Sequence, residues 1–252
     1  MNIKQGLRAA CVCALVALGL FGAVPAEASV VVAGTRVIFN AQDRETTVKL
    51  SNQGRQPALV QVWLDAGDAK ASPSSIEVPF TITPPVSRVD PSKGQTLRVL
   101  YTGEPLPQDK ESVFWLNVLE VPPKPGADMA DANTLQLAFR TRIKMFYRPA
   151  GLAGTALDAP SQVTWRLVGN GNRLALEARN PTPYYVSYAA VEVVTGDKRV
   201  PSKDGGMVGP GETCRFPLAA EAVVTAGSKV RFRAINDWGG PAEGESPLTA
   251  SP

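Results

Sequence analysis

Residues 135–149 read LQLAFRTRIKMFYRP, and this stretch predicts an unusually long β-strand. Apolar side chains take alternate positions at its start, and basic residues stand between the apolar ones further on. Extended at roughly 3.3 Å per residue, the stretch would span about 50 Å, whereas typical strands have only about 5–6 residues. Because a long strand with one apolar face and an exposed ladder of backbone groups tends to pair with other chains, we expect it to serve an interaction.

The rest of the chain carries the same signature of β-structure. Short runs rich in Val, Ile, Leu and Phe alternate with clusters of Pro, Gly, Asn and Asp, as strands alternate with turns. The predicted strands are 30–41, 45–53, 57–65, 80–85, 95–103, 112–123, 135–149, 163–169, 173–181, 184–194, 212–218 and 229–237. The pattern predicts an all-β protein built from antiparallel sandwiches of immunoglobulin type.

A break near residue 149 divides these strands into two groups. Pro149 and the Gly-rich positions after it end the long strand, and a second set of strand signals follows. We therefore expect an N-terminal domain over residues 29–148 and a C-terminal domain over residues 149–252. The last segment, 239–252, reads GGPAEGESPLTASP, lacks strand signals and is predicted to be a disordered tail.

The N-terminus predicts export. Lys4 and Arg8 precede a short apolar stretch that ends in the tripeptide AEA. This order is typical of a signal peptide, here residues 1–28, with cleavage between Ala28 and Ser29; an uncleaved N-terminal anchor is the alternative. The apolar stretch is short for a membrane span, which needs roughly 20 residues. No later segment is long and apolar enough to cross a bilayer, so we expect no membrane insertion of the mature chain.

Composition excludes several kinds of chemistry. The sequence contains no histidine, so it lacks His-dependent catalytic triads and His-bearing zinc sites. No glycine-rich phosphate motif is present, and we expect neither a metal nor a cofactor. Cys214 is the one cysteine beyond the signal peptide, which excludes an intramolecular disulfide in the mature chain. A net charge of +3 is too small to indicate nucleic acid binding. Hydrolysis by paired carboxylates stays open, because two carboxylates meet in space without a sequence pattern.

Several segments, in their order along the chain, resemble the periplasmic pilus (fimbrial) chaperones of the chaperone–usher pathway. They are TRVIFNA (35–41), PALVQVWLD (57–65), FTITPPVSRVDPSKGQTLRVLYT (80–102), LPQDKESVFWLNVLEVPP (106–123), LQLAFRTRIKMFYRP (135–149), NPTPYYVS (180–187) and INDWGG (235–240). The resemblance implies two immunoglobulin-like domains set at an angle, with a cleft between them. It also implies a periplasmic protein, not an enzyme, that caps pilus subunits and delivers them to an outer-membrane usher.

By the same resemblance, the long strand is the one that such a chaperone lends to an incomplete subunit. Leu135, Leu137 and Phe139 match the alternating side chains that fill the subunit's groove. An ordinary core-facing strand is the alternative. We expect core burial and subunit binding to use opposite faces of the strand, with Gln136 and Ala138 pointing away from the subunit.

The resemblance also assigns an anchor for the subunit's C-terminal carboxylate. Arg36 and Lys144 match the two cations of this anchor, and a fixed carboxylate would set the register between the subunit and the lent strand. Lys144 differs in parity from Leu137 and Phe139. It should therefore face away from the lent side chains unless a bulge intervenes.

A further set of charges matches the family's interdomain network. Glu111, Arg148 and Asp237 belong to it, and a buried Arg between two carboxylates would fix the angle between the domains. Arg140 and Arg142 match no functional position and are predicted to be solvated.

Two remaining expectations concern subtype and assembly. The short loop before the lent strand and the lack of a cysteine pair resemble the short-loop branch of the family. The exposed strand edge predicts a self-capping homo-oligomer of the free protein. The main alternative to a chaperone is an exported two-domain immunoglobulin-like adhesion module that binds through its loops.

Overall fold

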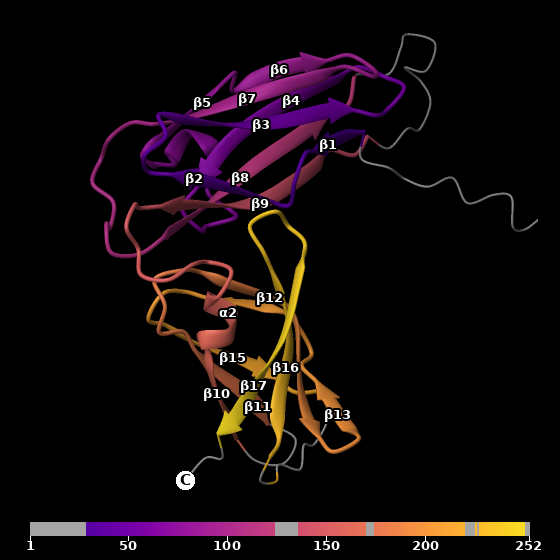
Figure 1. Cartoon of the computed structure of the whole chain (residues 1–252). Helices are drawn as coiled ribbons and strands as arrows, with labels where there is room; N and C mark the ends of the chain where they lie inside the picture. Colours follow the sequence, from indigo (N-terminus) through magenta and orange to yellow (C-terminus); the bar gives the residue numbers. More distant parts are fainter. Residues whose placement is uncertain (1–28, 124–135, 170–173, 220–224, 226, 250–252) are drawn as a thin grey trace, which may run out of the picture.

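The computed structural model describes residues 29–123, 136–169, 174–219, 225 and 227–249, and regular structure within them is nearly all β. Strands β1–β9 form an N-terminal domain and strands β10–β17 form a C-terminal domain (Figure 1). The domains lie at an angle: strands of the first run across the view in Figure 1, and strands of the second run down it. The predicted all-β fold with two domains is confirmed.

The N-terminal domain is a sandwich of two sheets, with strand orders β1-β3-β7-β5 and β2-β9-β8-β4-β6. Neighbouring strands are antiparallel, except that β2 runs parallel to β9. A short 3-10 helix, Pro73–Ser75, lies between β4 and β5. The strands are β1 (Val30–Val32), β2 (Arg36–Asn40), β3 (Glu45–Asn52), β4 (Ala58–Asp65), β5 (Phe80–Thr83), β6 (Val86–Val89), β7 (Gly94–Tyr101), β8 (Ser112–Val121) and β9 (Phe139–Arg148).

Alternation of side chains explains how this sandwich closes. In β4, Val60, Val62 and Leu64 are buried while the residues between them are more exposed, as expected for a strand with one face in the core. Aromatic rings fill the centre of the domain, where the Phe80 ring centroid lies 4.9 Å from that of Phe114. Apolar burial and aromatic packing therefore hold the two sheets together.

The C-terminal domain has one continuous strand path, β13-β12-β16-β17-β10-β11-β15, with β14 paired to β12. Its buried centre contains Trp165, whose ring lies 5.2 Å from that of Tyr188. A short helix, α2 (Ala159–Gln162), precedes the first strand. The strands are β10 (Thr164–Val168), β11 (Ala175–Arg179), β12 (Val186–Thr195), β13 (Lys198–Pro201), β14 (Gly206–Val208), β15 (Thr213–Pro217), β16 (Lys229–Ile235) and β17 (Pro241–Thr249).

Strand β17 corrects the prediction of a disordered tail. Residues 241–247 pair antiparallel with β16, and residues 248–249 pair parallel with β10. The segment has little apolar alternation, and backbone pairing with β16 and then with β10 holds it in place. Gly244 is needed in it, because a Cβ at this position would collide with the ring of Phe232. Residues 250–252 lie outside the described residues.

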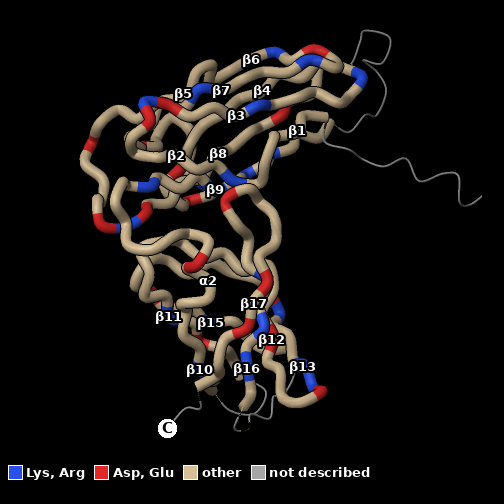
Figure 2. Tube along the Cα trace, in the orientation of Figure 1, with Lys and Arg blue, Asp and Glu red and all other residues tan. Residues whose placement is uncertain are grey.

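Other predictions fall where the structure gives no description. The predicted signal peptide (1–28), most of the loop before the long strand (124–134) and Leu135 lie outside the described residues. Within the described part of the chain, no helix is long and apolar enough to cross a membrane. Acidic and basic residues are interspersed over both domains (Figure 2).

Candidate functional site at the domain junction

Arg36 and Lys144 lie side by side where the two domains meet. Arg36 begins β2, Lys144 lies within β9, and the two are register partners in the parallel pairing of these strands. Both side chains are half-buried. Because paired residues on neighbouring strands point to the same side of a sheet, the two cations share one face.

Each of the two side chains also contacts the C-terminal domain. The Arg36 Nη1 donates a hydrogen bond to the backbone oxygen of Ile235, at the end of β16, over 2.9 Å. The Lys144 Nζ donates to the Oγ of Ser187, on β12, over 3.2 Å. The guanidinium of Arg36 also lies 5.7 Å from the centre of the Phe146 ring. Both cations therefore occupy the corner between the domains.

Arg36 and Lys144 carry charge that no carboxylate of the described residues neutralises through an ion pair. Within that part of the chain, the buried Arg36 Nε has no hydrogen-bond partner. Burial lowers the pKa of Arg36, and the charges of Asp237 and Glu111 offset part of the shift. Burial lowers the pKa of Lys144, and the charge of Arg36 lowers it further. Two adjacent cations with a spare donor suit an anion, and a carboxylate matches both groups.

A second charge cluster, formed by Glu111, Arg148 and Asp237, spans the junction. Arg148, at the end of β9, donates through Nε to the Glu111 Oε1 over 2.6 Å. Its Nη1 and Nη2 donate to the two carboxylate oxygens of Asp237 over 2.7 and 2.9 Å. The other Glu111 oxygen accepts the N–H of Tyr185 over 2.7 Å. Asp237 and Tyr185 belong to the C-terminal domain, so these contacts tie the two domains together.

Burial makes the members of this cluster depend on one another. Glu111 is only 3% exposed. Burial raises the pKa of Glu111, and the charge of Arg148 counteracts part of that shift. Burial lowers the pKa of Arg148, but hydrogen bonds with Asp237 and the charge of Glu111 outweigh it, and the net shift is upward. Arg148 therefore stays charged, and Glu111 relies on it for stabilisation.

Strand β9 extends beyond β2 and leaves part of its edge open. Strand β8 pairs with β9 from Phe139 to Tyr147. Strand β2 pairs only with residues 144–148. Among the described residues, 139–143 therefore have a neighbouring strand on one side only. Backbone groups on the other side are available to pair with a further strand.

Odd-numbered side chains of β9 are exposed at the N-terminal end of the strand and buried at its C-terminal end. Met145 and Tyr147 are buried in the N-terminal core, whereas Phe139 is 38% exposed and Leu137, just before the strand, is 53% exposed. The pairing with β8 has no bulge, so Lys144 has the opposite parity to Phe139. The expectation that the lent side chains and the core lie on opposite faces is therefore wrong. Phe139 shares the core face, and it is exposed because the sandwich ends before the strand does.

Arg140 and Arg142 are held by polar partners, which corrects the prediction that they are solvated. Arg142 donates to both carboxylate oxygens of Asp65, over 2.9 Å from Nε and 2.5 Å from Nη2. Arg140 donates through Nε to the Oδ1 of Asn117 over 2.8 Å, and through Nη1 to the backbone oxygen of Ala69 over 2.7 Å. Asp65 and Asn117 are almost fully buried. We call these four side chains (Asp65, Asn117, Arg140 and Arg142) the arginine clamp.

Two tryptophans complete the surroundings of the arginine clamp. The guanidinium of Arg140 lies 5.0 Å from the centre of the Trp63 ring, and that of Arg142 lies 4.6 Å from Trp115. Burial raises the pKa of Asp65, but hydrogen bonds from Arg142 and the other donors outweigh it, so its pKa lies below the usual value. The clamp thus fixes the even-numbered face of β9 behind Phe139.

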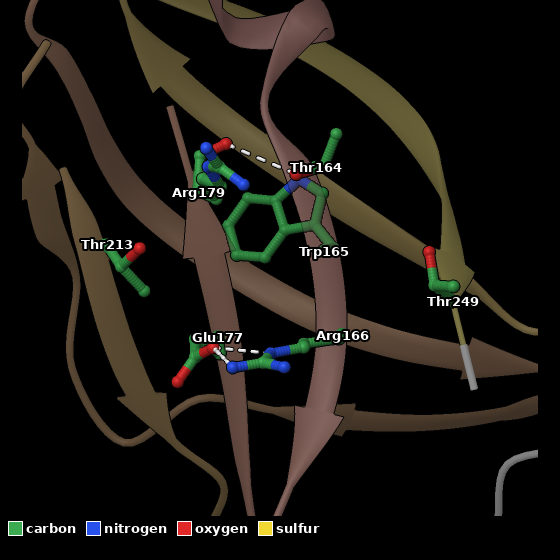
Figure 3. A pocket seen from close by; sticks show the side chains of 7 residues that line it. All are labelled: Thr164, Trp165, Arg166, Glu177, Arg179, Thr213 and Thr249. Atoms are coloured by element: carbon green, nitrogen blue, oxygen red, sulfur yellow. Dashed lines mark hydrogen bonds and ion pairs between the residues drawn. The ribbon is translucent and has the colours of Figure 1, made fainter. Parts of the chain in front are cut away.

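A pocket of about 480 Å³ lies elsewhere, on the C-terminal domain (Figure 3). Among the described residues, Glu177 is the one carboxylate in the lining, and it pairs with Arg166 and, outside the lining, with Arg215. The residues that line it are Thr164, Trp165, Arg166, Glu177, Arg179, Thr213 and Thr249.

Comparison with protein families gives two matches that together cover most of the chain. Residues 29–153 match the model described as pili and flagellar-assembly chaperone, PapD N-terminal domain. Residues 158–246 match the model described as pili assembly chaperone PapD, C-terminal domain.

Comparison with individual proteins gives relatives and structures of the same kind. The chain is 48% identical over 223 residues to the probable fimbrial chaperone YadV of Escherichia coli K12, covering 88% of this chain and 90% of the relative. It is 48% identical to the chaperone protein FimB/FhaD of Bordetella pertussis, covering 85% and 86%. The crystal structure of the YadV chaperone aligns with a TM-score of 0.74 at 44% identity, covering 86% of this chain and 98% of that one. The Salmonella enterica SafB chaperone, solved in complex with the SafA pilin, aligns with a TM-score of 0.72 at 29% identity, covering 88% and 97%.

Proposed function

Because this chain belongs to the PapD-like family of pilus assembly chaperones, which is not an enzyme family, we propose that it caps fimbrial subunits in the periplasm by donor-strand complementation. In this proposal, residues 135–143 are lent to a subunit that lacks one strand of its own fold, and they supply both backbone partners and apolar side chains. The capped subunit is then delivered to an outer-membrane usher.

The observation that carries the proposal is the unneutralised pair Arg36 and Lys144 at the inner end of an open strand edge. We propose that the pair binds the C-terminal carboxylate of the subunit. Arg36 offers a planar fork with a spare Nε donor, and Lys144 offers a point charge with further N–H groups. A carboxylate bound there would restore the electrostatic stabilisation that burial removes from both cations.

The direction of the bound subunit strand follows from the same geometry. The open edge runs from Phe139 to Ile143, and Lys144 comes directly after it in the chain direction. A strand that lies along this edge and places its C-terminal carboxylate at Lys144 must run in the same direction as β9. We therefore propose parallel pairing, in line with β2, which is also parallel to β9.

Side chains on the core face of the lent segment are proposed to enter the subunit. Phe139 and Leu137 are exposed in the free protein, and Leu135 continues the same parity in the sequence. Burial of each such side chain contributes roughly 1.5–3 kcal/mol before the ordering cost of association is subtracted. Three of them would make a tight complex that the N-terminal strand of the next subunit can still displace.

Further parts of the proposal concern processing and assembly. The signal peptide 1–28 is proposed to be removed before Ser29, and the domain boundary is placed between residues 148 and 149. Glu111, Arg148 and Asp237 are proposed to hold the domain angle at which the anchor and the lent strand are both accessible. We also propose that the open edges of two copies pair with each other in the free chaperone. The short loop before the lent strand supports the proposal that the chain belongs to the short-loop branch of the family.

The anchor is tested by co-expression with the pilin-like protein of the same genome. Arg36→Ala and Lys144→Ala are compared with wild type and with the control Lys229→Ala. Lys229, on β16, forms an exposed ion pair with Glu245 on β17. The measured quantity is the soluble pilin recovered with the tagged chaperone, alongside the thermal midpoint of the chaperone alone. Loss of a charge-assisted contact of roughly 1.5–3 kcal/mol lowers affinity about 10- to 100-fold. If both variants protect the pilin as well as wild type, the anchor assignment is wrong.

The lent segment is tested separately by crosslinking. A photoreactive residue at position 137 should crosslink to the pilin, whereas one at exposed Lys49 on β3 should not. Equal crosslinking from the two positions would contradict the proposed use of β9 while leaving the anchor result unaffected.

A further inference from the structure

Glu120 is a buried carboxylate that the proposed function does not use. It lies near the end of β8 and is 8% exposed. Its register partners are Val60 on β4 and Phe139 on β9, and Val60 is a core residue, so the Glu120 side chain points to the inside of the sandwich. A carboxylate in such a position needs donors or a counter-charge, because burial of an unpaired charge is unfavourable.

Both oxygens of Glu120 are bonded to the first two residues after the expected cleavage point. The Ser29 Oγ donates to Oε1, and the Val30 N–H donates to Oε2 over 3.0 Å. Ser29 is also held through its carbonyl oxygen, which accepts the Gln53 N–H over 2.7 Å. Its Cβ fills the space beside Gly54, where any further side chain would collide with it. The start of the mature chain is therefore fixed against Glu120.

Among the described residues, the register partners of Glu120 on the neighbouring strands are uncharged. Buried or core-facing residues at its level are Val30 on β1, Asn52 on β3, Val60 on β4 and Phe139 on β9. No Lys or Arg of the described residues forms an ion pair with it. The carboxylate thus has hydrogen-bond donors but no counter-charge in this part of the chain.

We propose that Glu120 is the docking site for the α-ammonium group that cleavage between Ala28 and Ser29 creates. The proposal rests on the cleavage point given under the proposed function. Hydrolysis of that peptide bond consumes one water, leaves a carboxylate on Ala28 and converts the amide nitrogen of Ser29 into an ammonium group. This nitrogen is separated from the Oγ of its own residue by only three covalent bonds. Since the Oγ already contacts Glu120, the new charge arises beside its counter-charge.

The ion pair would join the two sheets of the N-terminal domain at one end. Ser29 leads directly into β1 of the four-stranded sheet, while Glu120 belongs to β8 of the five-stranded sheet. Glu120 also pairs in register with Phe139, the residue at which β9 leaves the core. Signal-peptide removal therefore strengthens the end of the sandwich from which the lent segment emerges, and the unprocessed chain lacks this contact.

The test compares two forms of residues 29–252, one with a free α-amino group and one with an acetylated N-terminus. The pKa of the α-amino group is measured from the pH dependence of N-terminal labelling, and thermal midpoints are measured from pH 7 to pH 10. An α-amino group ordinarily has a pKa of about 7.7–8.0, and we expect the free form to show one about a unit higher. The free form should melt several degrees above the acetylated form at pH 7. This advantage should vanish as pH rises through the raised pKa, because a cation with a raised folded-state pKa stabilises only while it is protonated.

Variants separate this ion pair from general effects of losing a buried glutamate. Glu120→Gln should return the α-amino pKa to its ordinary range and abolish the difference between the two forms. The control Glu177→Gln, at a buried glutamate of the C-terminal domain, should preserve that difference. An ordinary α-amino pKa in the wild type, or equal midpoints of its free and acetylated forms, overturns the proposal even if Glu120→Gln fails to fold. An exported chain whose mass shows a first residue other than Ser29 overturns it too, without affecting the anchor at Arg36 and Lys144.

Discussion

Replacing Arg148 with methionine is expected to destabilise the domain junction strongly, because it leaves a buried carboxylate without its partner. Glu111 is 3% exposed and, among the described residues, would keep the Tyr185 N–H as its one donor, whereas Asp237 is partly exposed and can be hydrated. Breaking a buried pair in this way costs about 3–5 kcal/mol. The effect is measured as the change in unfolding free energy in urea, with domain-specific probes because a two-domain chain need not unfold in one step.

A double-mutant cycle tests whether the orphaned charge is the cause. Glu111→Gln alone removes one charge-assisted hydrogen bond of about 1.5–3 kcal/mol but leaves Arg148 paired with Asp237. In the double variant neither Glu111 nor Arg148 leaves a buried charge without its partner, so the combined loss should be clearly smaller than the sum of the two single losses. Lys229→Met, which breaks an exposed ion pair, is the control and should leave the midpoint unchanged. A loss below about 1 kcal/mol for Arg148→Met, or strict additivity in the cycle, would refute the reasoning.

Three further outcomes are expected from the same geometry. Subunit binding should take up protons at alkaline pH, because a bound carboxylate favours the charged form of Lys144, whose pKa is lowered in the free protein. Binding should therefore weaken as pH rises through that lowered pKa. Calorimetry in buffers of different ionisation enthalpy measures the proton uptake. Asp65→Asn should increase hydrogen exchange in residues 139–143 and slow subunit capture, whereas Asp68→Asn, an exposed neighbour outside the arginine clamp, should change neither. Phe139→Ala should lower subunit affinity about tenfold with little change in stability. Met145→Ala, at a fully buried residue on the same face, should cost about 2–5 kcal/mol of stability. Similar stability losses for both variants would contradict the inference that Met145 serves the core while Phe139 serves subunit binding.

Sequence patterns predicted the elements whose side chains alternate over many residues. Strands β4, β7 and β8 are long, have one face in the core and carry the alternation that marks a half-buried strand. Strands β6, β13 and β14 have only three or four residues, too few for a period to stand out. The sequence does not reveal strand β17, because its pairing depends on backbone contacts with β16 and β10 and on the small size of Gly244.

The arginine clamp cannot be predicted from the sequence for a related reason. Asp65, Asn117 and Arg142 come from β4, β8 and β9, which are neighbours only once the sheet order is known. Arg140, Arg142 and Lys144 have equal parity in the sequence. The sequence does not show that Asp65 and Asn117 lie on neighbouring strands within reach of the arginines, so the arginines are predicted to be solvated.

The parity of β9 constrains how a subunit would have to bind. Phe139 lies on the core face of the strand, while Lys144 and its partner Arg36 lie on the opposite face. A flat ligand on either face would reach only one of these groups. A strand that pairs with the open edge at 139–143 reaches both, because its own alternate residues project to the two sides of the sheet. Its terminal carboxylate would then meet Arg36 and Lys144 on one side, while the body of the subunit receives Phe139 on the other. The single long strand therefore favours edge pairing over docking on a face. Edge pairing is the geometry that donor-strand complementation requires.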